Sequence, residues 1–135
     1  MRDWMQPQSI ANFNTRQECL KTLYSSYKVD DINVNCNLTI GESTADYAGV
    51  KAAYEALTAS STTTPSAKRL FFTSFAQLYC KDSRAKAVKE ALLADPHAPA
   101  RYRVIGTLSQ FPPFAEAFEC TVGSPMAPLH PCSFW

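Results

Sequence analysis

The sequence predicts a mainly α-helical protein. Apolar residues recur at three- and four-residue spacing in most segments, which is the period of a helix with one buried face. Alternation of apolar and polar residues, the pattern of a half-buried strand, is rare. The composition is that of a folded globular protein, because 46% of the 135 residues are hydrophobic and 19% are charged. A chain of this length makes one domain or part of one.

The first expected helix runs from about Gln8 to Tyr24. Its apolar positions are Phe13, Leu20 and Leu23. No capping residue precedes this helix, and Trp4 and Met5 stand close to the terminus. We expect such an abrupt start when a sequence begins in the middle of a domain.

Further helices are expected along the middle of the chain. The apolar positions with helical spacing are Tyr47, Val50, Tyr54 and Leu57, then Phe71, Phe75 and Leu78, then Ala85, Val88 and Leu92. A run rich in serine and threonine, Ala59 to Ser66, separates the first two groups and ends near Pro65. This composition predicts a loop.

The last third of the sequence is expected to hold a strand, a helix and an irregular tail. Tyr102 to Leu108 is the best strand candidate, although it is short. Phe111, Phe114 and Phe118 again have helical spacing, and the intervening Pro112-Pro113 suits a first helical turn. The tail from Gly123 to Pro131 holds three prolines and one glycine, which predicts an irregular surface segment.

Charge and hydropathy exclude several function classes. The net charge is +1, and no basic run is longer than Lys68-Arg69, so we expect no nucleic acid or anionic membrane as partner. The first residues, Met1 to Trp4, lack the apolar stretch of a signal peptide. The apolar runs are also far shorter than a membrane span.

Five cysteines are spread over the chain without a CxxC pair, which does not indicate a zinc finger or a thioredoxin motif. Two interpretations stay open: long-range disulfides in an oxidising compartment, or buried free thiols. The odd count leaves at least one cysteine unpaired or paired elsewhere. Asn37-Leu38-Thr39 is a glycosylation sequon that favours secretion, although such tripeptides also arise by chance.

Two acidic residues carry the first indication of chemistry. Glu42 and Asp46 are four apart, so on a helix they share one face, which continues through the small residues Gly49 and Ala53. Such a face can pack closely against a second helix. If that helix held a zinc ion, one carboxylate could ligate the metal and the other could orient a ligating imidazole. The alternative interpretation is a solvated helix face, the commoner role of such a pair.

The segment Gly41-Glu42-x-x-Ala45-Asp46 resembles the Gly-Glu-Asn-Ile-Ala-Asp signature of the neprilysin and endothelin-converting-enzyme family of zinc metallopeptidases. The resemblance runs almost end to end. Further matching motifs, in order, are Asp3-Trp4 with Ser9-x-x-Asn12-Phe13 and Cys19, Leu70-Phe71-Phe72 with Phe75-Ala76-Gln77 and Cys80, Asp95-x-His97-x-Pro99, Arg103 to Leu108, Phe114-x-Glu116-Ala117-Phe118-x-Cys120, and Cys132-x-x-Trp135. Several ordered motifs at compatible spacing make the resemblance specific.

The resemblance implies a role for each matching side chain in peptide hydrolysis. Glu42 would be the third zinc ligand, and Asp46 would hold a ligating histidine in place. His97 would stabilise the oxyanion of the tetrahedral intermediate, and Arg103 would bind a substrate carbonyl. The pocket for the hydrophobic residue after the scissile bond would be lined by Leu78 and Tyr79.

The resemblance also implies the covalent and cellular context. Cys19 would pair with Cys132, and the family partners of Cys80 and Cys120 lie outside the residues of this chain. Residues 1–135 would form the C-terminal helical part of a thermolysin-like catalytic domain. The parent protein would act on peptides at the cell surface or outside the cell, and it could be membrane-anchored.

The chain departs from the family pattern in one large respect. It has no HExxH motif, and its two histidines, His97 and His130, are not the two that hold zinc in the family. Its residues therefore cannot build the family's zinc site of two histidines and one glutamate. His130 matches nothing in the family and is expected on the surface. Smaller departures are Ser43-Thr44, Ala48 and Cys36. We therefore expect a C-terminal fragment that is inactive alone. The alternatives are a truncated paralogue that binds peptides or a partner, and a structural disulfide domain.

Overall fold

The computed structural model describes residues 4–59 and 63–134, and within them the protein is mainly α-helical, as predicted. Asp3 and Trp135, which belong to two of the matching motifs, and part of the expected loop at 59–66 lie outside these ranges. The elements in order are α1 (Pro7–Ser25), β1 (Lys28–Val29), β2 (Ile32–Asn33), α2 (Cys36–Thr58), α3 (Pro65–Gln77), α4 (Ala85–Ala94), α5 (Ala100–Ser109) and α6 (Pro112–Ala117).

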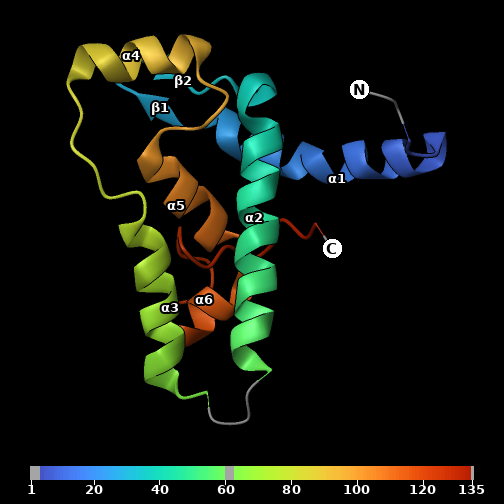
Figure 1. The fold of residues 1–135 in the computed structure, drawn as a ribbon, viewed down its shortest axis with the longest axis vertical. Coiled ribbons are helices and arrows are strands. Elements are labelled where there is room, and N and C mark those ends of the chain that lie inside the picture. The colour runs from blue at the N-terminus through green and yellow to red at the C-terminus, as the bar shows by residue number, and fades with distance from the viewer. Residues whose placement is uncertain (1–3, 60–62, 135) are drawn as a thin grey trace.

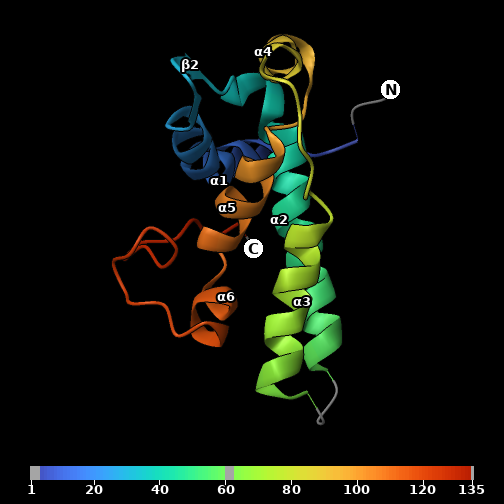
Figure 2. The ribbon, with the colours of Figure 1, turned by 90° about the vertical axis from the view of Figure 1, so that its left-hand side faces the viewer.

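The helices form two layers. The long helix α2 and helix α3 run alongside each other as an antiparallel pair, and α5 and α6 cover one side of that pair (Figures 1 and 2). Helix α1 crosses the upper part of α2, and α4 lies across the upper end beside the short β1–β2 hairpin (Figure 1). The core therefore lies where α1, α2 and α5 meet and continues down between α3 and α6.

Capping side chains explain where the two long central helices begin. Asn35 accepts a hydrogen bond from the backbone N–H of Leu38 at the start of α2. Thr64 does the same for the N–H of Ala67, and Pro65 occupies the first turn of α3, where no N–H is needed. Helix α3 therefore begins inside the segment that the sequence predicts as a loop.

The prediction of a strand at Tyr102 to Leu108 is wrong, because this segment lies within helix α5. Four consecutive residues, 106–109, are buried there, since α5 is enclosed by neighbouring elements on more than one side. A short run that is buried on several sides has no clear period, so its spacing does not separate helix from strand. The sequence also missed the hairpin at Lys28–Asn33, whose turn residue Asp30 has φ 52°.

The lower half of the core is aromatic. Phe72 is 1% exposed, Tyr54 stacks on it with ring centroids 5.2 Å apart, and Phe111 meets the Tyr54 ring edge-on at 5.5 Å. Offset and edge-on geometries are the favourable ones for aromatic rings. These contacts join α2, α3 and the start of α6. They therefore fix the position of α2, the helix that carries Glu42 and Asp46.

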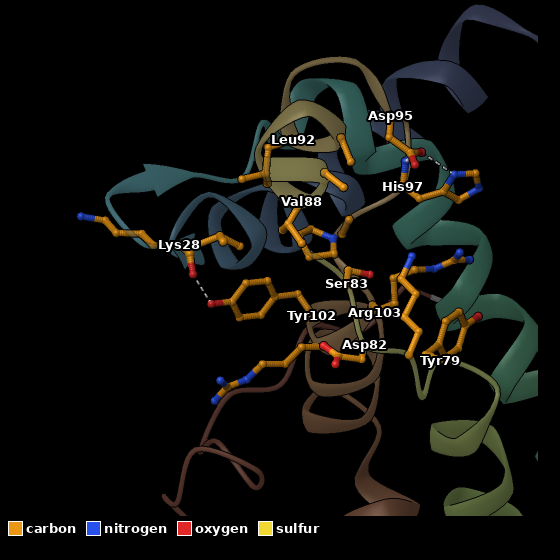
Figure 3. A pocket seen from close by; sticks show the side chains of 18 of the residues that line it. Lys28, Tyr79, Asp82, Ser83, Val88, Leu92, Asp95, His97, Tyr102 and Arg103 are labelled. Atoms are coloured by element: carbon orange, nitrogen blue, oxygen red, sulfur yellow. Dashed lines mark hydrogen bonds and ion pairs between the residues drawn. The ribbon is translucent and has the colours of Figure 1, made fainter. Parts of the chain in front are cut away.

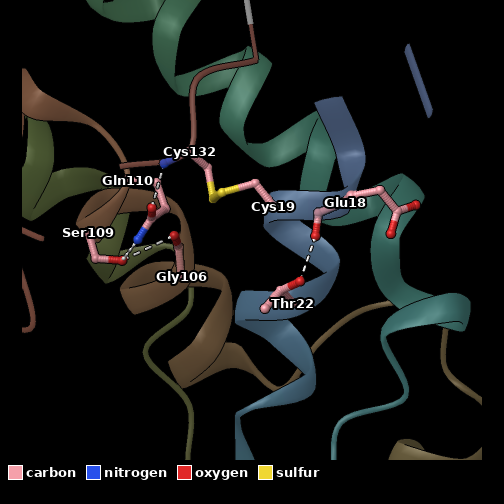
Figure 4. The surroundings of a disulfide bond; sticks show 7 residues. All are labelled: Glu18, Cys19, Thr22, Gly106, Ser109, Gln110 and Cys132. Carbon is pink, nitrogen blue, oxygen red and sulfur yellow. Dashed lines mark hydrogen bonds between the residues drawn. A yellow bond between two sulfur atoms is a disulfide. The ribbon is translucent and has the colours of Figure 1, made fainter. Parts of the chain in front are cut away.

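The C-terminal tail is tied back to α1 by a disulfide. Cys19 and Cys132 are bonded, as the resemblance implies, with their Cα atoms 5.6 Å apart (Figure 4). The backbone N–H of Cys132 donates to Gln110 at 2.8 Å, and Arg16 donates to the carbonyl of Phe134 at 2.7 Å. Free thiols within the described ranges are Cys36, Cys80 and Cys120. Between residues 123 and 131 the tail is irregular apart from one isolated bridge, as predicted.

Two glycines in this fold should respond in opposite ways to the same substitution. A Cβ on Gly106 would lie 2.6 Å from Cζ and Oη of Tyr24, a side chain that is 1% exposed and whose pKa burial raises to about 12. A Cβ on Gly49 would meet nothing within 4 Å. We expect Gly106→Ala to lower the free energy of unfolding by about 1–3 kcal/mol, the usual cost of overpacking.

Gly49→Ala is the matched control, because both glycines are helical. It should raise the free energy of unfolding by roughly 0.5–1 kcal/mol through the better helix propensity of alanine. Urea denaturation of the two variants measures both effects. Equal changes in the two variants would show that the Tyr24 contact is not tight in solution.

Candidate active site

The acidic pair of α2 lies on one face of the helix, but its two members have different surroundings. The Glu42 side chain is 45% exposed, whereas that of Asp46 is 8% exposed. Asp46 accepts hydrogen bonds from Nε and Nη2 of Arg103 at 2.7 and 2.6 Å, and from Oη of Tyr79 at 3.2 Å. A carboxylate that accepts a two-pronged bond from a guanidinium is held in a fixed orientation.

Arg103 is the centre of this network. Its guanidinium also lies over the Tyr79 ring, 4.6 Å from the centroid, which adds a cation–π contact. The hydrogen bond to Asp46 raises the pKa of Arg103 further above its already high value, so this residue is cationic at every relevant pH. Burial raises the pKa of Tyr79, which therefore stays a neutral hydroxyl donor at neutral pH.

His97 lies next to Glu42. Its Nε2 is 3.4 Å from Oε2 of Glu42, and its Nδ1 is 2.7 Å from Oδ1 of Asp95. The backbone N–H of His97 donates to the same Asp95 oxygen at 2.9 Å. The backbone bond and then the ring contact lower the pKa of Asp95, so this carboxylate is ionised and acts as an acceptor. Nδ1 therefore carries a proton on the side of Asp95 (Figure 3), and Nε2 is the nitrogen presented to Glu42.

Most of the predicted site residues meet around two hollows, although Glu42 lines neither of them. His97, Arg103, Leu78 and Tyr79 line a cavity of about 1070 Å³ between α4, β1 and the start of α5. Asp46, Leu78 and Tyr79 also line a smaller groove of about 380 Å³ between α2 and α3. Leu78 is 77% exposed, so its side chain is open to a ligand.

In the part of the chain that the structure describes, the small residues of α2 have no helix packed closely on them, so their predicted packing against a helix that holds zinc stays a prediction. Gly49 and Ala53 line the groove instead, and the space above Gly49 is open. Phe71 and Phe75 of α3 and Leu78 just after it border the groove, so the hollow is largely apolar; the polar residues in its lining are Asp46, Ser74 and Tyr79.

The donor side chains among the described residues do not by themselves complete a zinc site. Within residues 4–59 and 63–134, no group of three or more histidine, cysteine, aspartate or glutamate side chains is arranged to hold a metal. Protein zinc sites use at least three such ligands. Glu42 offers one carboxylate with His97 beside it, and His130 is exposed on the tail and lines neither hollow.

Asn37 is exposed in the first turn of α2. The side chain is therefore accessible to a modifying group. In the part of the chain that the structure describes, no helix is both long and apolar enough to cross a membrane.

Sequence reasoning missed three contacts in this site, the first of which is the pairing of Arg103 with Asp46. Asp95 belongs to the motif Asp95-x-His97-x-Pro99, but its contact with His97 was not predicted. An aspartate side chain often accepts a hydrogen bond from the backbone two residues further on, so this spacing was a usable signal. The hydrogen bond from Tyr79 to Asp46 had no signal, because 33 residues separate the two.

Comparison with known proteins places the site in a family. The family model described as Peptidase family M13 matches residues 1–134. The chain is 41% identical to an endothelin-converting enzyme homolog of Locusta migratoria and 39% identical to endothelin-converting enzyme 1 of Homo sapiens, in each case over 100% of the chain and 20% or 19% of the relative.

Neprilysin-3 of Drosophila melanogaster is 38% identical over 98% of the chain and 18% of its own length. The chain thus spans about a fifth of the length of the curated relatives it matches. The match covers every segment that carries the network around Asp46 and the contact between His97 and Glu42. The chain belongs to peptidase family M13.

Proposed function

We propose that this chain forms one wall of the substrate cleft of a zinc endopeptidase that cleaves peptides on the amino side of hydrophobic residues. The observation that carries the proposal is the convergence of four polar side chains from distant segments. His97 contacts Glu42 across 55 residues of sequence, and Arg103 contacts Asp46 across 57. If this helix face had no functional role, Glu42 and Asp46 could both be exposed to solvent and would need neither contact.

In this proposal Glu42 is the one zinc ligand that the chain contributes. Its exposure and its contact with His97 fit a ligand that faces a metal held by other residues. The residues of this chain do not complete that ligand set, so we assign the metal no step here. Asp46 is the orienting carboxylate, and Arg103 and Tyr79 hold it in place.

His97 and Arg103 are proposed to stabilise charge on the substrate. A donor helps catalysis most when it already points to where negative charge develops. His97 is oriented by Asp95 through two hydrogen bonds, and Arg103 by Asp46 through two more. Leu78 and Tyr79 border both hollows and are proposed to hold the hydrophobic residue after the scissile bond.

The full-length peptidase offers a direct kinetic test. His97→Ala should lower kcat by about 10²–10³ with little change in KM, because the lost contact strengthens in the transition state. His130→Ala is the matched control, since it removes the chain's other histidine from an exposed tail position and should leave both constants unchanged. Wild-type kinetics in His97→Ala would show that this segment packs but does not take part in catalysis.

The isolated chain should neither retain zinc nor hydrolyse peptides. One carboxylate and one neighbouring imidazole make a poor zinc site, because stable sites use three or four protein ligands. We expect far less than one zinc per chain after dialysis against a chelator, measured by atomic emission. Stoichiometric zinc that resists chelation would contradict the ligand assignment.

A second candidate is a non-catalytic protein that binds peptides or a partner. The incomplete donor set within the described residues favours it for this chain by itself. The same zinc measurement, combined with peptide binding, separates the two: binding without zinc and without hydrolysis supports it. In either case we propose an extracellular or outward-facing plasma-membrane location, which the Cys19–Cys132 disulfide supports.

A further inference from the structure

One motif of the sequence has no part in the proposed function. Asn37-Leu38-Thr39 is the only Asn-x-Ser/Thr tripeptide among the 135 residues. Such a tripeptide is the acceptor for an N-linked glycan, a bulky group that needs a place on the protein surface. Because the tripeptide also arises by chance, the surroundings of its two polar side chains decide whether the chain can carry a glycan there.

The asparagine of the sequon is exposed, and the fold does not use its side chain. Asn37 lies in the first turn of α2, but the side chain that caps this helix belongs to Asn35. Within the residues that the structure describes, the Asn37 side chain makes no hydrogen bond. A group attached to its amide nitrogen therefore breaks no contact of the fold.

The helix surface next to Asn37 has room for a sugar. Gly41 follows Asn37 by four residues, so the two lie on the same side of α2, one turn apart. Gly41 is exposed, and a Cβ added to it would meet nothing within 4 Å. The first sugar units can therefore lie along this side of the helix without displacing a neighbouring element.

Helix geometry also separates the glycan from the acidic face. Glu42 follows Asn37 by five residues, which at 3.6 residues per turn places the two side chains about 140° apart around the helix axis. Asp46 follows Asn37 by nine residues and lies on the opposite side of the helix, about 180° away. A glycan on Asn37 therefore projects away from the contact between Glu42 and His97.

The threonine of the sequon, in contrast, is buried. Thr39 is 3% exposed, and its hydroxyl oxygen is inaccessible to solvent. The enzyme that attaches the glycan recognises the hydroxyl residue of the tripeptide as well as the asparagine. It cannot reach Thr39 once α2 has packed into the core. Only a chain in which this segment is still unfolded offers the whole sequon.

We propose that Asn37 carries an N-linked glycan that is attached before α2 folds. In the transfer, Nδ2 of Asn37 bonds to C1 of an oligosaccharide carried on a lipid pyrophosphate. The bond from C1 to the pyrophosphate breaks, the lipid pyrophosphate leaves with the electron pair, and the nitrogen releases a proton. The Cys19–Cys132 disulfide supports the proposal, because disulfides form in the secretory lumen, where such glycans are attached.

Cell-free translation with endoplasmic-reticulum microsomes tests the attachment. The chain, preceded by a cleavable signal peptide, should gain mass that peptide-N-glycosidase removes, with aspartate left at position 37. Asn37→Gln and Thr39→Val should abolish the gain, whereas Thr39→Ser, which keeps the sequon, should retain it. Asn35→Gln is the matched control, since it removes an exposed asparagine outside the sequon and should also retain the gain. A wild-type chain that gains no mass, while a known glycoprotein in the same reaction does, would overturn the proposal.

The order of attachment and folding has a separate test. The oxidised chain with its Cys19–Cys132 bond, and the same chain reduced and alkylated, are each incubated with solubilised oligosaccharyltransferase and a lipid-linked oligosaccharide. We expect the reduced chain to be glycosylated at least about 10-fold faster, because a buried site reacts only through the open form of the chain. Equal rates would show that the burial of Thr39 does not restrict the transfer and that the proposed order is wrong.

The direction of the glycan is tested on the full-length peptidase from secreting cells. The inference does not rest on the proposed function, so this measurement concerns only where the glycan lies. Asn37→Gln should have the kcat and KM of the glycosylated wild type, because Asn37 and Glu42 lie on different sides of α2. A variant with a clearly lower KM or higher kcat would show that the glycan reaches the cleft and that its placement away from Glu42 is wrong.

Discussion

Removing the Cys19–Cys132 disulfide is expected to lower the free energy of unfolding by about 4–5 kcal/mol, because it closes a loop of 113 residues. In the chain-entropy model a bond across so long a loop removes much of the freedom of the unfolded chain. The double variant Cys19→Ser with Cys132→Ser loses that restriction. The magnitude is comparable with the whole stability of a small domain, which is about 5–15 kcal/mol.

Guanidinium denaturation of the oxidised wild type and of the double variant measures this loss. Cys80→Ser is the control, because Cys80 is exposed and not bonded to another cysteine of this chain, and it should change stability by less than about 0.5 kcal/mol. The tail keeps other anchors in the variant, since Phe134 is 1% exposed and packs edge-on against Phe13. Equal stability of oxidised wild type and double variant would show that these anchors suffice.

The helices could be predicted from the sequence where one face of the helix is buried and the opposite face is exposed to solvent. Helix α2 is such a case, since Tyr47, Val50 and Tyr54 are buried at helical spacing. The prediction failed at α5, where residues 106–109 are all buried and the period disappears. It also missed the β1–β2 hairpin, because strands of two residues are too short to show alternation.

The candidate site was predictable in part. Spacing alone places Glu42 and Asp46 on one face of a helix, because that relation is local. The partner of Asp46 is not local: Arg103 lies 57 residues away on α5, and the resemblance gave it a role towards the substrate without indicating this contact. Interactions of this kind follow from the packing of α5 against α2, which sequence periodicity does not encode.

The Asp46–Arg103 pair provides the second large expected effect. Asp46→Asn should lower the free energy of unfolding by about 2–4 kcal/mol, since it leaves a largely buried guanidinium without its charged partner. The new amide would also face donor groups of Arg103. Glu42→Gln is the matched control: it removes the same charge from the same helix face, but the Glu42 side chain is 45% exposed, so the cost should stay below about 0.5 kcal/mol.

A double-mutant cycle then isolates the pair. Arg103→Gln alone should also be costly, because it leaves the Asp46 carboxylate, whose side chain is 8% exposed, without a cation. The variant with both substitutions removes both charges together, so it should be less unstable than the sum of the single losses by about 1–3 kcal/mol. Chemical denaturation of the four proteins gives this coupling energy directly. Additive losses would show that each residue stabilises the fold through other neighbours, such as the hydroxyl of Tyr79, and that the ion pair itself contributes little.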